Sequence, residues 1–153
     1  MLARFGQGAL LTGLLLLVGC SSFNREWQQN SFSAPTEDIQ GRWQGTWASE
    51  ATGHTDKLRC IISKKTDGTF QAWFHAKYKK VLSFGYTVPL KVELVDRAWK
   101  FQGEADLGWL AGGVYHYKGS AGGTNFTSTY ESKYDHGTFE MNRADPGIDA
   151  GRR

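Results

Sequence analysis

Residues 83–94 decide the fold, and they read SFGYTVPLKVEL. Large apolar side chains occupy every second position, and polar or small residues occupy the positions between them. Successive side chains of a β-strand point to opposite faces, so this period predicts a long strand with one buried face. Pro89 lies on the polar face and predicts an edge position or a bulge, because proline has no N–H to donate to a neighbouring strand.

Shorter runs with the same alternation cover most of residues 39–143, and turn residues separate them. Thr66-Asp67-Gly68-Thr69 and Asp135-His136-Gly137 are two of these turns. The span holds about eight strands joined by short hairpin connections. A sheet with a single buried face must pack on another sheet or close on itself. The sequential hairpins therefore predict an all-β fold, a single antiparallel up-and-down barrel of about eight strands.

The apolar face of each predicted strand points into the barrel. A transmembrane barrel turns its apolar face toward lipid, whereas here Lys, Arg, Glu and Gln occupy the opposite face of nearly every strand. We therefore expect a water-soluble domain. The predicted inward set is Trp43, Trp47, Leu58, Cys60, Ile62, Phe70, Phe74, Phe84, Tyr86, Val88, Leu90, Trp99, Phe101, Tyr115, Tyr117, Phe126, Tyr130, Phe139 and Met141.

The two ends of this span carry a recognisable pair. Gly41-Arg42-Trp43 opens the first predicted strand, and Arg143 closes the last. The pair resembles the G-x-W signature of lipocalins and implies a lipocalin-like or other calycin-type barrel. By that resemblance Trp43 plugs one end of the barrel and Arg143 packs across its indole. A cation over an indole face contributes about 1 kcal/mol and here would join the first strand to the last.

The N-terminus has the pattern of an export signal. Arg4 precedes a short apolar run from Ala9 to Val18, which is too short to span a bilayer as a mature helix. Leu17-Val18-Gly19-Cys20 resembles a bacterial lipobox, which implies that Cys20 is acylated and becomes the first mature residue. In enterobacterial lipoprotein sorting, the serines that follow it carry no retention signal. The resemblance thus predicts a lipid-anchored protein of the bacterial cell envelope, in the outer membrane.

Four segments follow from these patterns. Residues 1–19 are a lipoprotein signal peptide, residues 20–38 are the acylated cysteine and a flexible tether, residues 39–143 are the β-barrel domain, and residues 144–153 are a flexible tail. Trp27 in the tether is open to two interpretations: it enters the membrane interface, or it docks on the domain.

The charge balance excludes a nucleic-acid partner. The net charge of +3 is small for 153 residues, and it does not indicate strong attraction to polyanions. With Cys20 acylated, Cys60 has no partner for a disulfide within the chain, and we expect it in the core. The predicted partners are the membrane, through the anchor, and a small apolar ligand, while a protein partner stays unassigned.

The aromatic interior supports two hypotheses. An eight-stranded barrel is just wide enough to be filled by side chains or to hold one small ligand. A filled barrel would be a structural or protein-interaction module of the envelope. A hollow barrel would bind a small apolar or aromatic ligand, oriented by buried tyrosine hydroxyls, and this is the function that we favour. The candidate ligand-binding residues are Trp47, Tyr86, Trp99, Tyr115, Tyr117 and Tyr130.

No pattern indicates an enzyme, a cofactor or a metal site. The four histidines, His54, His75, His116 and His136, lie in separate segments without the spacing of a known metal site. The sequence has no nucleophile elbow and no phosphate-binding glycine loop. Trp73 and Trp109 fall outside the inward set. They predict either a docking patch near Lys77, Lys79 and Lys80 or a second, minor core.

Overall fold

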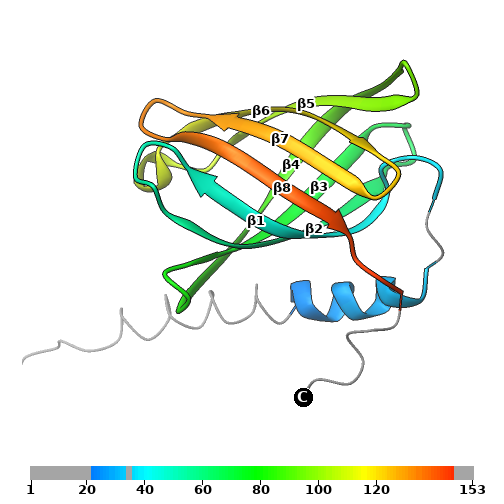
Figure 1. Cartoon of the computed structure of the whole chain (residues 1–153), viewed down its shortest axis with the longest axis horizontal. Coiled ribbons are helices and arrows are strands. Elements are labelled where there is room, and N and C mark those ends of the chain that lie inside the picture. Colours follow the sequence, from blue (N-terminus) through cyan, green and yellow to red (C-terminus); the bar gives the residue numbers. More distant parts are fainter. Residues whose placement is uncertain (1–21, 34–35, 147–153) are drawn as a thin grey trace, which may run out of the picture.

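A computed structural model of the chain describes residues 22–33 and 36–146, and it is a closed antiparallel β-barrel (Figure 1). Each strand pairs with the next along the chain, and β8 pairs with β1 to close the barrel. The predicted up-and-down barrel is confirmed. The strands are β1 (Gly41–Ser49), β2 (Thr55–Lys64), β3 (Phe70–Tyr78), β4 (Leu82–Val95), β5 (Ala98–Asp106), β6 (Val114–Gly122), β7 (Asn125–Glu131) and β8 (His136–Arg143).

Three short helical segments accompany the strands. Residues 22–29 form a helix that continues into the 3-10 helix η1 (Asn30–Phe32), and a second 3-10 helix, η2 (Trp109–Ala111), lies between β5 and β6. Among the described residues, no helix combines the length and the apolar character needed to span a membrane.

Strand β4 shows both the strength and the limit of the sequence pattern. Val88 and Leu90 are buried as predicted, Phe84 faces the barrel interior but is partly exposed, and Leu94 is largely exposed. The 14 residues of β4 exceed the 9 of β3 and of β5, so its ends extend beyond the core. The pairing of β4 with β5 ends at Leu90, so Pro89 lies at a locally open edge, in agreement with its predicted position.

One end of the barrel is closed by Trp43 beneath Arg143. The Trp43 side chain is fully buried, and its Nε1 donates a hydrogen bond of 2.9 Å to the carbonyl oxygen of Ile39. The Arg143 guanidinium carbon lies 4.4 Å from the centre of the indole. Arg143 also donates to the carbonyl oxygens of Gln40 (2.6 Å), Asp38 and Gly123, so one side chain joins the segment before β1 to the β6–β7 turn.

The seam between β1 and β8 requires glycine at two positions. A Cβ atom at Gly45 would lie 2.0 Å from the Glu140 carbonyl oxygen, and one at Gly137 would lie 1.9 Å from the Ala48 carbonyl oxygen. No side chain fits at such distances. These glycines therefore let the first and last strands approach closely enough to close a small barrel.

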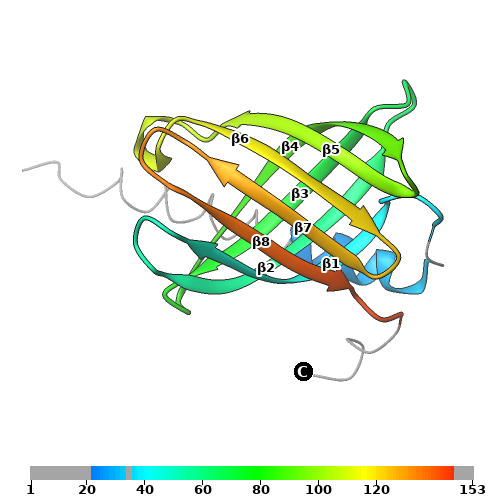
Figure 2. The same ribbon diagram turned by 45° about the horizontal axis from the view of Figure 1, so that its top comes forward.

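The N-terminal segment differs from its prediction. Residues 22–29, expected to be part of a flexible tether, form a helix against the outer wall of the barrel (Figures 1 and 2). Phe23 and Trp27 are fully buried against Ile61 and Trp73, and the Arg59 guanidinium lies about 5.1 Å from both helix rings. Of the two interpretations of Trp27, docking on the domain is the one that the structure bears out.

The C-terminal segment also differs in part. Residues 144–153 are predicted to be a flexible tail, yet Ala144 donates its N–H to the Arg42 carbonyl oxygen at 3.0 Å. The Arg42 side chain in turn donates to the Asp145 carbonyl oxygen at 2.9 Å. The first residues after β8 are therefore fixed against β1. Residues 147–153 lie outside the described part of the chain.

His75 lies beneath the N-terminal helix. Its ring stacks on Phe23, with 4.8 Å between the ring centres, and its Nε2 is buried without a hydrogen-bond partner among the described residues. Burial lowers the pKa of His75 below its ordinary value, and the charges of Arg59 and Lys77 lower it further. The packed helix therefore favours the neutral imidazole.

We expect Trp43→Ala to lower the free energy of unfolding by about 3 to 5 kcal/mol, because it leaves a large cavity in the plug and removes the partner of Arg143. Urea denaturation followed by far-UV circular dichroism measures the change. Trp109→Ala is the matched control, since Trp109 is 84% exposed and its removal should change stability by less than about 0.5 kcal/mol. A loss below about 1 kcal/mol for Trp43→Ala would contradict the plug.

We expect acidification to destabilise the protein through His75. Because its pKa is lowered on folding, the unfolded chain binds the proton first, and stability falls as the pH drops below about 6.5. His75→Phe keeps the ring contact with Phe23 but cannot titrate. The urea midpoint of the wild type should therefore fall more steeply between about pH 7.5 and pH 5 than that of the variant. Parallel pH profiles for the two proteins would contradict the role of His75.

Candidate functional site

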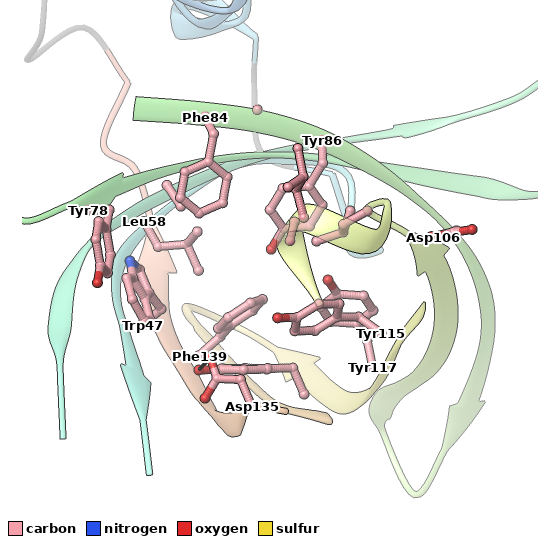
Figure 3. A pocket seen from close by; sticks show the side chains of 16 residues that line it. Trp47, Leu58, Tyr78, Phe84, Tyr86, Asp106, Tyr115, Tyr117, Asp135 and Phe139 are labelled. Carbon is pink, nitrogen blue, oxygen red and sulfur yellow. Dashed lines mark hydrogen bonds between the residues drawn. The ribbon is translucent and has the colours of Figure 1, made fainter. Parts of the chain in front are cut away.

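The barrel interior is filled at the plugged end and hollow at the other. Phe126 packs on Trp43 and stacks on Phe101, and Cys60 and Phe74 are buried in the same core. Beyond this layer a cavity of about 740 Å³ reaches the opposite end of the barrel (Figure 3). We call this end the mouth; it is formed by the β1–β2, β3–β4, β5–β6 and β7–β8 connections.

Five of the six candidate ligand-binding residues line the cavity. Trp47 projects from β1, Tyr86 from β4, Tyr115 and Tyr117 from β6, and Tyr130 from β7 (Figure 3). They come from four strands and share the inward parity that the sequence pattern predicts. The structure thus brings together residues that lie up to 83 positions apart, from Trp47 to Tyr130.

Trp99, the sixth candidate, is not at the cavity. It stands near the start of β5, opposite Leu94 and Ala121, at the plugged end of the barrel. Its Nε1 donates a hydrogen bond of 3.0 Å to the Glu37 carbonyl oxygen. The prediction was wrong because alternation shows which face of a strand a residue occupies, but not its height along the barrel.

The tyrosine rings bound the cavity and also pack on one another. Tyr117 stacks on Tyr86 and on Tyr115, with ring centres 6.2 and 6.4 Å apart. Tyr130 contacts Tyr115 at 6.0 Å and Phe139 at 5.1 Å. The filled and the hollow hypothesis therefore each describe part of the molecule. The rings pack on one another, as in a filled barrel, and they also line an open cavity, as in a hollow one.

Burial keeps these phenols neutral. It raises the pKa of Tyr86, of Tyr117 and of Tyr130, and the nearby Asp135 carboxylate raises that of Tyr130 further. The hydroxyl groups are therefore protonated at physiological pH and act as neutral donors and acceptors.

Asp135 places a carboxylate at the wall of the mouth. Its Oδ1 accepts a hydrogen bond of 2.6 Å from the Ser49 hydroxyl, and its Oδ2 lies 3.3 Å from the Tyr130 hydroxyl. Ser132 holds the surrounding turn through hydrogen bonds with the backbone of residue 135. Asp106 is the other carboxylate at the cavity, but its side chain is directed away from it and accepts the Gly108 N–H (Figure 3).

Several residues of this site were not predicted from the sequence. Asp135 was assigned only to a turn, and Leu107, Leu110 and Ala111, which reach the mouth from the β5–β6 connection, were assigned to a glycine-rich loop. No periodic pattern exists in such connections, so burial there cannot be predicted from alternation. The apolar character of the residues 107–111 was the available signal.

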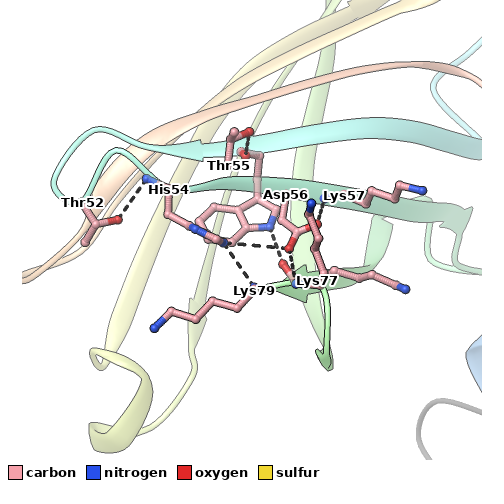
Figure 4. Close-up of polar contacts among 9 residues, drawn as sticks. Thr52, His54, Thr55, Asp56, Lys57, Lys77 and Lys79 are labelled. Atoms are coloured by element: carbon pink, nitrogen blue, oxygen red, sulfur yellow. Dashed lines mark hydrogen bonds and ion pairs between the residues drawn. The ribbon is translucent and has the colours of Figure 1, made fainter.

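A polar network fixes the β3–β4 turn at the mouth (Figure 4). Trp47 donates its Nε1 to the Lys77 carbonyl oxygen at 2.8 Å, and its ring lies 5.2 Å from that of His54. The Lys79 N–H donates to His54 Nε2, and the Lys80 N–H donates to Asp56 at 2.8 Å. The His54 and Asp56 side chains therefore hold the β3–β4 turn by accepting hydrogen bonds from its backbone. The described residues include no group of three His, Cys, Asp or Glu placed to hold a metal ion.

The mouth is bordered by exposed apolar side chains. Val81 in the β3–β4 turn and Trp109 and Leu110 in η2 are each more than 80% exposed. Trp73, by contrast, packs on Phe23 in the minor core beneath the N-terminal helix. Of the two predicted outcomes for surface tryptophans, Trp73 thus belongs to a second core, while Trp109 stays exposed beside the cavity.

One predicted site residue is not described by the structure. Cys20, the predicted acylation site, falls outside the residues that the structure describes.

Comparison with protein-family models, with curated proteins and with solved structures gives no match to this chain. The cavity and its chemistry are therefore the features from which a function can be inferred.

Proposed function

We propose that this chain is a membrane-anchored envelope lipoprotein whose barrel binds a small apolar or aromatic ligand. The observation that carries the proposal is the cavity of about 740 Å³, walled by aromatic rings. Its volume lies within the range of roughly 300 to 1,000 Å³ that is typical of small-molecule sites. Such sites combine an apolar wall with a few placed polar groups, and the tyrosine hydroxyls and Asp135 supply those groups here.

The wall chemistry favours an apolar ligand. Burying apolar surface stabilises a complex by about 25 cal/mol for each Å² removed from water. Trp47, Phe84 and Phe139 offer such surface, and flat rings suit the faces of an aromatic or alicyclic body. The exposed apolar side chains at the border of the mouth offer the ligand further apolar surface where it enters.

The anchor is proposed on the sequence pattern around Cys20, and the position of the N-terminal helix adds to it. Ser22, where the described helix begins, follows Cys20 by two positions. Because that helix is docked on the barrel wall, acyl chains on Cys20 would hold the domain close to the bilayer. We assign the anchor to the outer membrane, because Ser21 and Ser22 resemble residues that carry no retention signal in enterobacterial lipoprotein sorting.

The exposed border of the mouth favours a second candidate function. Trp109 and Leu110 form an apolar surface of the kind that also marks protein contacts. A structural or interaction module would use this surface without needing the cavity. Ligand binding by the isolated protein separates the two functions.

We expect the mature chain to bind Nile red, a neutral probe whose fluorescence rises in apolar surroundings. Ala76→Phe should weaken this binding about tenfold or more, because Ala76 is buried on the cavity wall and a phenyl ring there occupies the ligand's space. Lys77→Gln is the matched control, since the next residue of β3 faces outward, and it should bind like the wild type. A wild-type protein that leaves the probe unbound would contradict the proposed function and favour the interaction module.

We expect Cys20→Ser to abolish acylation and release the protein from membranes. The measurements are incorporation of an alkyne palmitate analogue and sedimentation with the membrane fraction. Cys60→Ala is the control: Cys60 is fully buried, burial raises the pKa of its thiol, and its removal should leave labelling intact. Label or membrane sedimentation retained by Cys20→Ser would show that the anchor lies elsewhere.

A further inference from the structure

We propose that the cavity selects an organic cation, an amine or quaternary ammonium with an apolar body, over an anionic amphiphile such as a fatty acid. The inference rests on the proposed function and adds the charge of the ligand to it.

The first observation is the sign of the charge at the cavity. Asp135 places a carboxylate at the cavity wall, whereas the Asp106 side chain is directed away from the cavity, and neither lysine nor arginine lines the cavity in the described part of the chain (Figure 3). A carboxylate head entering the mouth would leave water to meet another carboxylate, with no cation to compensate it. Removing an ion from water without a partner is strongly unfavourable, so an anionic ligand is selected against.

The second observation is the set of rings beside Asp135. Tyr130, whose hydroxyl lies 3.3 Å from Asp135 Oδ2, packs against Tyr115 and Phe139 at 6.0 and 5.1 Å. The carboxylate thus stands at the edge of a three-ring cluster. The negative face of an aromatic ring attracts cations, and rings beside a carboxylate are the arrangement that recognises ammonium groups.

The third observation is that Asp135 is held in place but not neutralised. Ser49 and Tyr130 each occupy one of its oxygens, and two carboxylate oxygens together accept about four hydrogen bonds. No lysine or arginine among the described residues forms an ion pair with it. Accepting capacity and net negative charge therefore both remain for a ligand.

The lysines nearest the mouth do not change this assignment. Lys79 lies over the Tyr78 ring at 5.3 Å and Lys133 over the Tyr134 ring at 5.2 Å, and neither lysine lines the cavity. His54 accepts the Lys79 N–H and so contributes no free donor toward the ligand through that nitrogen. No lysine or arginine among the described residues therefore lines the cavity, whereas Asp135 lies at its wall.

The test is displacement of Nile red from the mature chain by two ligands of equal chain length, dodecyltrimethylammonium and dodecanoate, each below its micelle concentration. At about pH 8 dodecanoate is ionised. We expect the ammonium to displace the probe at a concentration at least about tenfold lower than the carboxylate, because the apolar contribution is shared and only the head differs. Dodecanol, the neutral ligand, should fall between them.

Two variants assign the effect to one carboxylate. Asp135→Asn keeps an oxygen to accept the Ser49 hydroxyl, and it should reduce the preference for the ammonium to about threefold or less. Asp106→Asn is the matched control, since that side chain is directed away from the cavity, and it should keep the wild-type ratio (Figure 3). Near-UV circular dichroism checks that both variants are folded.

The outcomes separate this inference from the proposed function. If Nile red binds but dodecanoate displaces it as well as the ammonium does, the cavity binds ligands without selecting a cation, and the inference is overturned alone. An unchanged ratio in Asp135→Asn also overturns it, because the carboxylate then takes no part in selection. If Nile red does not bind the wild type, both the function and its specificity fail together.

Discussion

Closure of β8 on β1 is the constraint on which the rest of the molecule depends. An up-and-down sheet with one apolar face has two exposed edges until its first and last strands meet. Here glycines at Gly45 and Gly137 let the two backbones approach, and the stack of Arg143 on Trp43 joins the ends of those strands. Without this seam the apolar face of the sheet would be open to water, and the inward-facing rings would be exposed to solvent. The plug is therefore part of the closure as well as a cover for one end.

The plug also determines where function can reside. Indole, phenyl and aliphatic groups fill the barrel above Trp43, so a ligand can enter only from the opposite end. There the strands diverge: β4 pairs with β5 only from Leu90 onward, and its first half pairs with β3 alone. The barrel wall therefore has fewer pairings between strands at the end where the cavity lies. The mouth is built from turns and a 3-10 helix, whose sequence can change without disturbing closure.

Alternation along the strands was sufficient to predict the barrel, its inward face and most of the cavity wall, because one buried face imposes a period of two wherever a strand exists. It could not place Trp99, since strand parity contains no information on height along the barrel. It also missed the helix at residues 22–29, where the fully buried side chains are those of two apolar residues four positions apart, Phe23 and Trp27. Asp135 was missed for a related reason. It lies in a turn, which has no periodic pattern, and the position of Asp135 at the cavity depends on which strands that turn connects.

The docked helix links the two halves of the proposed function. A long flexible tether would let the barrel move tens of ångströms from the bilayer and would leave the mouth unoriented. The helix instead packs Phe23 and Trp27 on β2 and β3, so the described chain from Ser22 onward is fixed to one flank of the barrel (Figure 1). Because the N-terminal side of the helix is directed toward the mouth end of the barrel, the proposed anchor would precede the mouth end of the helix rather than the plugged end (Figure 1). The packing of a single short helix would then decide at which end of the barrel the chain leaves the proposed anchor.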